Sequence, residues 1–428
     1  MRISRFTPWQ TPRRDLEAIF VARQPILDEL VARAERAAGS ASRPHTLLVG
    51  PRGAGKTHLL AMLYYRLGDA IAQGRRLQVA RLPEDPVTVV SYPRLLAAVM
   101  SAVDSGQTAR LDADTLEAAL DRRAAEAGPI VVLLENLDEV FAQIGVDGQR
   151  KLRHYLQTST SLLLMSTTAL LDRSLTAQDS PFYGFFSVIR LQPLTVDHAQ
   201  DMLTAIARVH GDTELAEWLG GDVVRRRLEI VAHLAGSQPR LWSMFADIMG
   251  PDGFTQVADL LYASFDDLTP YYRDRLMSLT AQQRLVVAEL AEADHALPVQ
   301  AIAARTALPE RSVARTLGEL KDAGWVQPAT SRWAHLLDRR RTYYELAEPL
   351  ARIAFQVKDT LGQPIRLIVN FLSIWFDREQ ITKWSGDDNM YAAETAASFG
   401  SDSSLRLVRR LARLPDSVAA DAALIGQA

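Results

Sequence analysis

The stretch GPRGAGKT, residues 50–57, decides the fold of this chain. It matches the pattern G-x-x-x-x-G-K-[ST] and stands between an apolar run, HTLLVG (45–50), and a helical pattern, KTHLLAMLYYRL (56–67). Glycines let backbone N–H groups turn toward a phosphate, and the start of the following helix adds a positive dipole end. A strand, a glycine-rich loop and a helix in this order predict a phosphate-binding loop (P-loop) rather than an ordinary turn.

The P-loop predicts a bound ATP with Mg²⁺. The Lys56 ammonium would reach the β- and γ-phosphate oxygens, and the Thr57 hydroxyl would bind the metal. The other nucleotide contacts expected at this loop are Gly50, Pro51, Arg52, Gly53, Ala54, Gly55 and His58.

Short apolar runs alternate with helical patterns from about residue 41 to 195. The predicted strands are 45–50, 87–92, 130–135, 162–167 and 187–194, and the predicted helices are 26–38, 56–67 and 112–128. Continuous apolar strands separated by helices predict an α/β fold, a parallel sheet with helices on both faces. Residues 196–278 are helical by period and interrupted by glycines, with no further strand signal.

The acids in VVLLENLDEV (131–140) allow more than one assignment. If the strand ends at Glu135, Glu135 acts on the metal, and Asn136 stands where the water-activating Glu is expected. If the strand continues, Asp138 is the metal acid and Glu139 the base. A third arrangement places Glu135 and Asp138 on either side of the site, and in a fourth Asp138 and Glu139 simply begin the next helix. The first is preferred and predicts slow or partner-stimulated hydrolysis.

The composition is that of a large chain, and the absence of cysteine excludes disulfides and Cys-based metal sites. Its 428 residues are 48% hydrophobic and 23% charged, with a net charge of −3 and no cysteine. We expect several domains and a cytoplasmic protein, because the N-terminus lacks the apolar core of a secretory signal and no apolar run approaches the ~20 residues of a membrane span.

Several motifs together resemble a family, the AAA+ ATPases related to origin-recognition-type initiators and to archaeal and STAND NTPases. The motifs are IFVARQ (19–24), GPRGAGKT (50–57), LLENLDEVF (133–141), LLLMSTTALLD (162–172) and HLAGSQPR (233–240). The resemblance covers roughly residues 15–360 and implies a P-loop AAA+ sheet, an α-helical lid and a winged-helix domain.

The same resemblance implies roles for residues outside the P-loop. Val21 and Ala22 would pack against adenine, and Arg23 would brace the loop. Ser166 and Thr167 match the sensor 1 position, although Thr167 could equally be an ordinary strand-end hydroxyl. Arg240 matches the sensor 2 arginine of the lid, the alternative being a surface arginine at a helix start. Initiator-type relatives carry an arginine finger where this chain reads DSPFYGFF (179–186), a stretch without arginine. Arg173 is the nearest candidate for such a finger, and whether the chain forms oligomers is left open.

Residues 279–348 carry a winged-helix pattern. Three helical stretches (280–293, 297–307 and 308–326) precede two predicted wing strands, WVQP (325–328) and TYYELA (342–347). The third helix would enter the major groove of double-stranded DNA. The DNA-contacting residues expected on this helix and on the basic wing are Arg311, Ser312, Arg315, Thr316, Arg332, Arg339, Arg340 and Arg341.

The predicted organisation is an N-terminal segment (1–40), the nucleotide-binding core (41–195), the lid (196–278), the winged helix (279–348) and C-terminal helices with a partly ordered tail (349–428). We expect an ATP-driven switch that couples nucleotide state to DNA binding. The alternative is a STAND-like signalling or defence regulator whose winged helix and tail bind a protein effector.

Overall fold

The structure of the chain is a computed structural model. The residues it describes are 8–83, 89–104, 112–169, 175, 178–221, 224–225, 228–229, 232, 238–248, 276–277, 279–293, 296–329, 341–347 and 351. The chain divides into two compact units, Met1–Gln192 and Pro193–Ala428.

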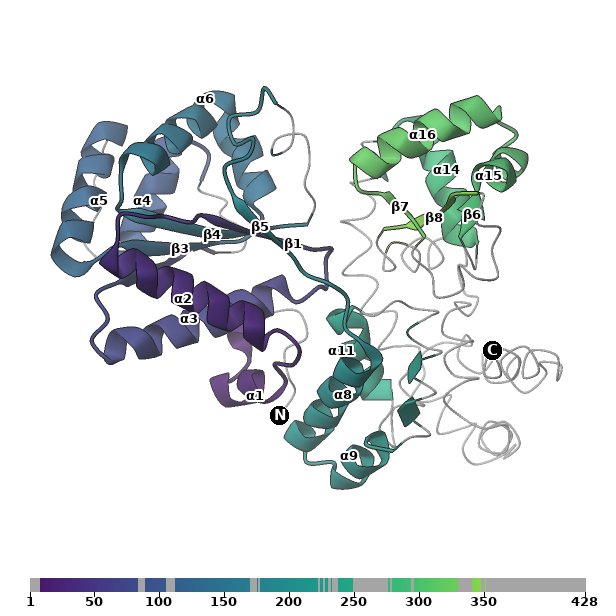
Figure 1. Cartoon of the computed structure of the whole chain (residues 1–428), viewed down its shortest axis with the longest axis horizontal. Coiled ribbons are helices and arrows are strands. Elements are labelled where there is room, and N and C mark those ends of the chain that lie inside the picture. Colours follow the sequence, from purple (N-terminus) through teal and green to yellow (C-terminus); the bar gives the residue numbers. More distant parts are fainter. Residues whose placement is uncertain are drawn as a thin grey trace, which may run out of the picture. The chain divides into compact units, whose positions relative to one another are not determined.

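The first unit is built on a five-stranded parallel sheet (Figure 1), and the hydrogen-bond pairing gives the strand order β2-β3-β4-β1-β5. Its strands are β1 (Thr46–Val49), β2 (Gln78–Arg81), β3 (Ile130–Leu134), β4 (Leu162–Thr168) and β5 (Ser187–Arg190). The first strand of the chain therefore lies between β4 and β5. The carboxyl ends of all five strands meet at one edge, where α/β sheets of this kind bind ligands.

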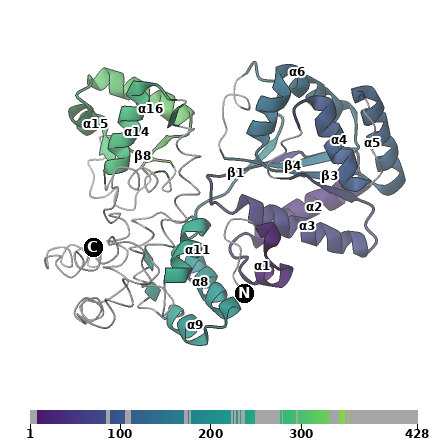
Figure 2. The same cartoon turned by 180° about the vertical axis from the view of Figure 1, so that it is seen from behind.

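Helices cover both faces of this sheet (Figures 1 and 2). One face carries α1 (Arg13–Ala18), α2 (Gln24–Gly39) and α3 (Lys56–Ala72), and the other carries α4 (Tyr92–Val103), α5 (Ala113–Ala127) and α6 (Leu137–Thr158). A short 3-10 helix, η1 (Pro8–Gln10), precedes α1.

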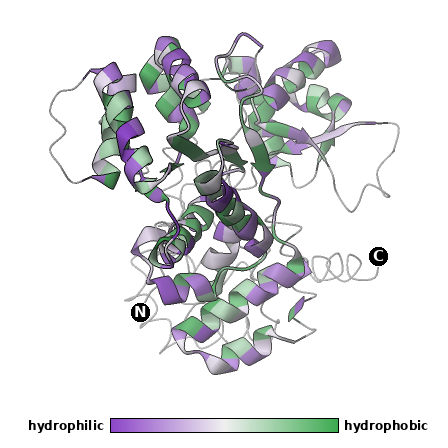
Figure 3. Ribbon diagram, turned by 60° about the vertical axis from the view of Figure 1, so that its left-hand side comes forward, coloured by the Kyte–Doolittle hydropathy of each residue, from purple (hydrophilic) through white to green (hydrophobic). Residues whose placement is uncertain are grey.

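Each face has its own hydrophobic core because successive strand side chains point to opposite sides. In β3, Val131 and Leu133 pack with α2 and α3, whereas Val132 and Leu134 pack with α4 and α6. The strands β1, β3 and β4 are buried along their whole length, and the strands at the centre of Figure 3 are coloured mainly as hydrophobic. Burial on both faces explains why these strands read as continuous apolar runs.

One predicted strand differs from the structure, and one helix is kinked. The strand expected at 87–92 is wrong in its described part, because Val89–Ser91 is not a strand and α4 begins at Tyr92; the sheet instead takes Gln78–Arg81, whose pattern is only partly buried. Helix α6 is also kinked at Gly145, which has φ 67° and ψ 176°. A glycine tolerates this conformation without a side-chain clash.

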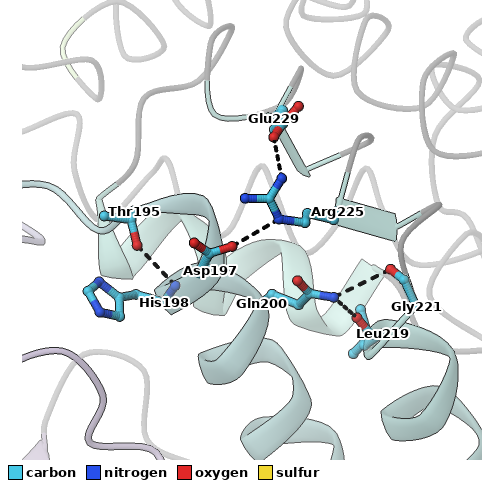
Figure 4. Close-up of polar contacts among 8 residues, drawn as sticks. All are labelled: Thr195, Asp197, His198, Gln200, Leu219, Gly221, Arg225 and Glu229. Carbon is cyan, nitrogen blue, oxygen red and sulfur yellow. Dashed lines mark hydrogen bonds and ion pairs between the residues drawn. The ribbon is translucent and has the colours of Figure 1, made fainter.

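The second unit begins, within the predicted lid, with the helices α8 (Val196–His210), α9 (Thr213–Leu219) and α11 (Pro239–Ile248). Thr195 caps α8 by accepting a hydrogen bond from the His198 amide at 3.2 Å. Arg225 joins Asp197 and Glu229, at 2.9 Å from each, and the Gln200 amide donates to the Leu219 and Gly221 carbonyls (Figure 4). These contacts tie the segment after α9 back onto α8.

The rest of the described second unit has the element order of a winged helix. It comprises α14 (Ala281–Glu292), β6 (Leu297–Pro298), α15 (Val299–Thr306), α16 (Glu310–Asp322), β7 (Val326–Pro328) and β8 (Tyr343–Leu346). The strands form an antiparallel sheet in the order β6-β8-β7, and the three helices pack together. The predicted fold class is thus confirmed, while most of the wing loop lies outside the described residues.

Within the described part of the chain, no helix has both the length and the apolar character needed to cross a membrane.

Candidate nucleotide-binding site

The P-loop turns tightly between β1 and α3. Gly53 and Gly55 adopt φ of 83° and 86°, the left-handed region that glycine enters without cost from a side chain. A Cβ on Gly50 would lie 3.1 Å from the Ala54 Cβ and 3.3 Å from the Leu191 Cβ, so the loop is closely packed there. The buried Lys56 ammonium donates to the Gly50 carbonyl at 2.6 Å and to the Pro51 carbonyl at 3.1 Å. Lysine therefore lies within the loop that would hold the phosphates.

Thr57 and Glu135 meet beside this loop. The Thr57 hydroxyl, in the first turn of α3, donates to the Glu135 Oε2, and Glu135 is only 4% exposed at the end of β3. β3 ends at Leu134, as the first assignment of the acids requires, and Leu137 begins α6, so the strand does not continue to Asp138. The structure thus brings together the two residues predicted to hold Mg²⁺.

The residues after Glu135 turn away into α6. Asn136 has φ 50° and ψ 54°, and its backbone N–H donates to the Thr167 hydroxyl at 3.3 Å. Asp138, half-buried in the first turn of α6, accepts from the Thr168 hydroxyl at 3.0 Å. Glu139 is exposed on the same turn. Asp138 is thus held at the end of β4 by the Thr168 hydroxyl.

Strand alternation separates these groups into two sets. Glu135 continues the face of Leu133, and Thr167 continues the face of Met165; both faces pack against α3. Ser166, buried with no partner for its hydroxyl, and Thr168 point to the other side, toward the face of Leu164. Thr167 is therefore the strand-end hydroxyl on the P-loop side of the sheet.

The segment before α2 lies against the P-loop. Arg23 is 7% exposed, and its Nη2 donates to the Ala54 carbonyl at 3.2 Å and the Gln192 carbonyl at 2.7 Å. Burial lowers the pKa of this guanidinium. Val21 and Ala22 are half-buried, and Ala22 adopts a left-handed φ of 64°. Arg23 thus connects the predicted adenine segment, the P-loop and the end of the sheet.

His58 contacts the N-terminal segment. Its Nε2 donates to the Leu16 carbonyl at 3.0 Å, and its ring lies 5.2 Å from that of Phe20. Burial lowers its pKa to about 4, so the ring is neutral at pH 7. The imidazole therefore holds α1 against α3.

The donor set fits Mg²⁺ bound together with a nucleotide. A hydroxyl and a carboxylate are hard oxygen ligands, and Mg²⁺ usually takes one or two protein ligands, phosphate oxygens and waters. Within the described ranges no group of three or more His, Cys, Asp or Glu side chains could hold a metal by itself. Thr57 and Glu135 would thus need phosphate oxygens to complete a metal site.

The remaining predicted residues lie in the second unit. Arg240 is half-buried in the first turn of α11. On α16, Arg311 and Arg315 are exposed and Ser312 is half-buried, and Arg315 Nε lies 3.7 Å from the Glu319 carboxylate. Arg341 is exposed, whereas Arg332, Arg339 and Arg340, like Arg173, lie outside the described residues.

The prediction that Thr316 contacts DNA is wrong. Its side chain is 2% exposed and accepts a hydrogen bond from the Gln282 amide of α14 at 2.9 Å. Position 316 follows Val313 by three residues on the buried face of the helix, so its hydroxyl joins two helices instead of facing solvent.

Sequence reasoning missed Trp9, Arg81 and Thr168. The Trp9 indole N–H donates to the Glu135 Oε1 at 3.1 Å, and the Arg81 guanidinium lies 4.0 Å from the centre of the indole ring. Trp9 is 126 residues from Glu135 in sequence, and no local pattern connects them. Thr168 follows the predicted sensor residues and could have been found by extending that strand by one residue.

Solved structures of other proteins share this architecture. A Walker-type ATPase of Pyrococcus abyssi aligns with a TM-score of 0.56 and 16% identity over 79% of this chain and 96% of that one. The ORC2 protein of Aeropyrum pernix, solved in ADPNP–ADP complexes, aligns with a TM-score of 0.54 and 14% identity over 81% of this chain and 98% of that one. The chain has an AAA+ fold. No protein-family model and no curated protein sequence matches it.

The resemblance to origin-recognition-type AAA+ ATPases is thus confirmed at the level of the fold. At this low sequence identity, a shared AAA+ fold does not assign functions to individual residues. The functions of the residues are inferred from the site geometry described above.

Proposed function

We propose that this chain is a Mg²⁺-dependent ATP-binding switch with slow or partner-stimulated hydrolysis. The observation that carries the proposal is the meeting of the Thr57 hydroxyl and the Glu135 carboxylate beside an intact P-loop. The nucleotides bound to the similarly folded ORC2 protein of Aeropyrum pernix support it. When bound, Mg²⁺ would neutralise charge on the phosphates, Lys56 would bind their oxygens, and Thr57 and Glu135 would hold the metal.

Slow turnover follows from the absence of a carboxylate at Asn136. An amide cannot take a proton from the attacking water, and a positioned general base contributes about 10²–10⁴-fold. Thr167 is the hydroxyl on the P-loop face that could orient the water, and Asp138 accepts a hydrogen bond from Thr168 at the end of the same strand.

The test for ATP has a binding part and a turnover part. Lys56→Ala should weaken ATP·Mg²⁺ binding at least tenfold by calorimetry, while Lys151→Ala, the same change at an exposed position of α6, should leave it unaltered. In phosphate release, Glu135→Gln should remove most turnover and Glu139→Gln should not. Equal ATP affinity of the parent and Lys56→Ala would refute the nucleotide site; loss of turnover in Glu139→Gln alone would refute the roles of the acids.

The second part of the proposal is that the winged helix binds double-stranded DNA. Support comes from the element order of residues 281–346 and from two exposed arginines, Arg311 and Arg315, near the start of α16. The N-terminal residues of the third helix in such modules approach the major groove. Phosphate contacts made by arginine depend steeply on salt because bound counterions are released.

Fluorescence anisotropy with duplex DNA across a salt series tests this part. The double variant Arg311→Ala/Arg315→Ala should bind about tenfold more weakly at low salt with a shallower salt slope. Lys321→Ala, which removes one charge from the last turn of the same helix, is the control. Absent or salt-independent binding by the parent would refute the DNA reading and favour a protein effector, the alternative for this module.

A further inference from the structure

The N-terminal 3-10 helix η1 places an indole on the acid of the nucleotide site. Both Glu135 carboxylate oxygens accept hydrogen bonds: Oε2 from the Thr57 hydroxyl and Oε1 from the Trp9 N–H at 3.1 Å. Since Glu135 is 4% exposed, its charge depends on such donors for stabilisation. Trp9 therefore fixes one half of a buried carboxylate whose other half faces the predicted metal ligand.

The indole is itself held from two sides. Arg81, the last residue of β2, stacks its guanidinium 4.0 Å from the ring centre, and Tyr64 of α3 meets the ring edge-on at 5.8 Å. An arginine over an indole face is an attractive arrangement. Trp9 is thus fixed between the neighbouring strand and the helix that carries Thr57.

The segment that follows Trp9 is anchored on the same helix. Arg13 makes two hydrogen bonds to Asp69 of α3, at 2.8 and 2.5 Å, and the Leu16 carbonyl accepts from His58 of α3. Because α3 begins at the P-loop, these contacts set the position of Trp9 relative to Thr57 and the loop.

We propose that Trp9 is a positioning residue for Glu135 and so for Mg²⁺ in the proposed nucleotide site, on which this inference rests. Its N–H selects the carboxylate orientation that presents Oε2 to Thr57 and the metal. Groups that orient metal-binding residues typically change metal affinity by about 10–100-fold when removed. Trp9 acts through Glu135 and contributes no ligand of its own.

Trp9→Phe is the direct test, because it keeps an aromatic ring for Arg81 and Tyr64 but removes the donor. Nucleotide binding is measured with ATP in EDTA and then in a Mg²⁺ titration. Binding in EDTA should stay within about twofold of the parent, and the Mg²⁺ concentration for half-maximal effect should rise about tenfold. Trp218→Phe, the same change at a 41%-exposed tryptophan of α9, should leave both unaltered.

A double-mutant cycle with Glu135→Gln separates positioning from general destabilisation. If Trp9 acts through Glu135, Trp9→Phe adds little to the Mg²⁺ dependence in the Glu135→Gln background, whereas independent effects add. Full additivity, or a parent-like Mg²⁺ dependence of Trp9→Phe, would overturn the inference. Failure of the nucleotide site itself would look different, since the parent would then bind ATP no better than Lys56→Ala.

Discussion

Asn136 shows why the acid motif departs from the usual pair. The residue has φ 50°, and its carbonyl accepts from the Glu139 and Val140 amides at 3.0 and 3.2 Å as α6 begins. Among residues other than glycine, asparagine enters this left-handed region most readily, together with aspartate. The local backbone therefore favours Asn over Glu at this position. The absence of a carboxylate at position 136 is thus linked to the left-handed turn between β3 and α6, and a change at Glu135, such as Glu135→Asp, would not supply one there.

Two buried histidines predict acid sensitivity of the first unit. Burial lowers the pKa of His45 and of His58 to about 4. A histidine whose pKa falls on folding stabilises the native state fully above its unfolded pKa of about 6.5, and this contribution is lost as pH falls from 6.5 toward 4.

We therefore expect urea unfolding of the first unit to show a decrease of about 2 kcal/mol per histidine between pH 7 and pH 5. His58→Gln should flatten that decrease, because the variant lacks the buried imidazole. An unchanged pH dependence in His58→Gln would contradict this assignment.

At the scale of elements, the turn from α5 into β3 fixes the edge of the sheet. Gly128 has φ 97°, and a Cβ there would lie 2.1 Å from the Arg76 carbonyl oxygen. The Gly128 carbonyl also accepts from the Gln78 side chain at 2.8 Å, so β2 and β3 meet at this turn.

Gly128→Ala should therefore lower the free energy of unfolding by more than about 3 kcal/mol, since strain and a backbone clash combine. Gly74→Ala is a matched control, because Gly74 has φ 90° but nothing within 4 Å of a new Cβ. That variant should lose only about 1–2 kcal/mol from its left-handed backbone. Thermal and urea denaturation measure both, and equal losses would show that the clash is relieved by movement.

The elements that the sequence predicted best are those with an unambiguous burial pattern. β3 and β4 are buried on both faces and were predicted almost to the residue. β2 was missed because only Ala80 of its four residues is buried and its apolar residues are few, whereas Val89–Ser91 directly precedes α4. Thr316 was wrongly assigned to the DNA-binding surface because its hydroxyl accepts a hydrogen bond from a neighbouring helix. Residue type alone does not reveal whether a polar side chain is buried in this way.

At the scale of the whole molecule, the sequence predicted the kinds of module better than the contacts within the site. The P-loop, the acid-bearing strand end and the winged-helix elements follow from motif and periodicity. The contacts from Trp9 to Glu135 and from Arg23 to Gln192 join residues more than a hundred positions apart. Such contacts form only once the sheet has assembled and the N-terminal segment has packed onto it, and periodicity carries no information about them.

A switch requires ATP and DNA to affect each other, and Arg240 is the residue proposed to connect them. If ATP and DNA each bind one arrangement of the modules more tightly than the other, ATP changes DNA affinity by some factor, and DNA must change ATP affinity by the same factor. We expect a factor of about 5–150, as is typical of coupled sites. Arg240→Ala should bring it close to one while DNA binding without nucleotide persists.

Anisotropy titrations of DNA with and without ATP, and ATP titrations with and without DNA, measure the factor in both directions. Arg208→Ala, at an exposed position of α8 in the same unit, is the control for loss of a lid arginine. Equal factors in the two directions that survive in Arg240→Ala would assign the coupling to other residues. A parent factor of one would mean that the chain binds its two ligands independently, because a ligand with no preference between arrangements shifts neither.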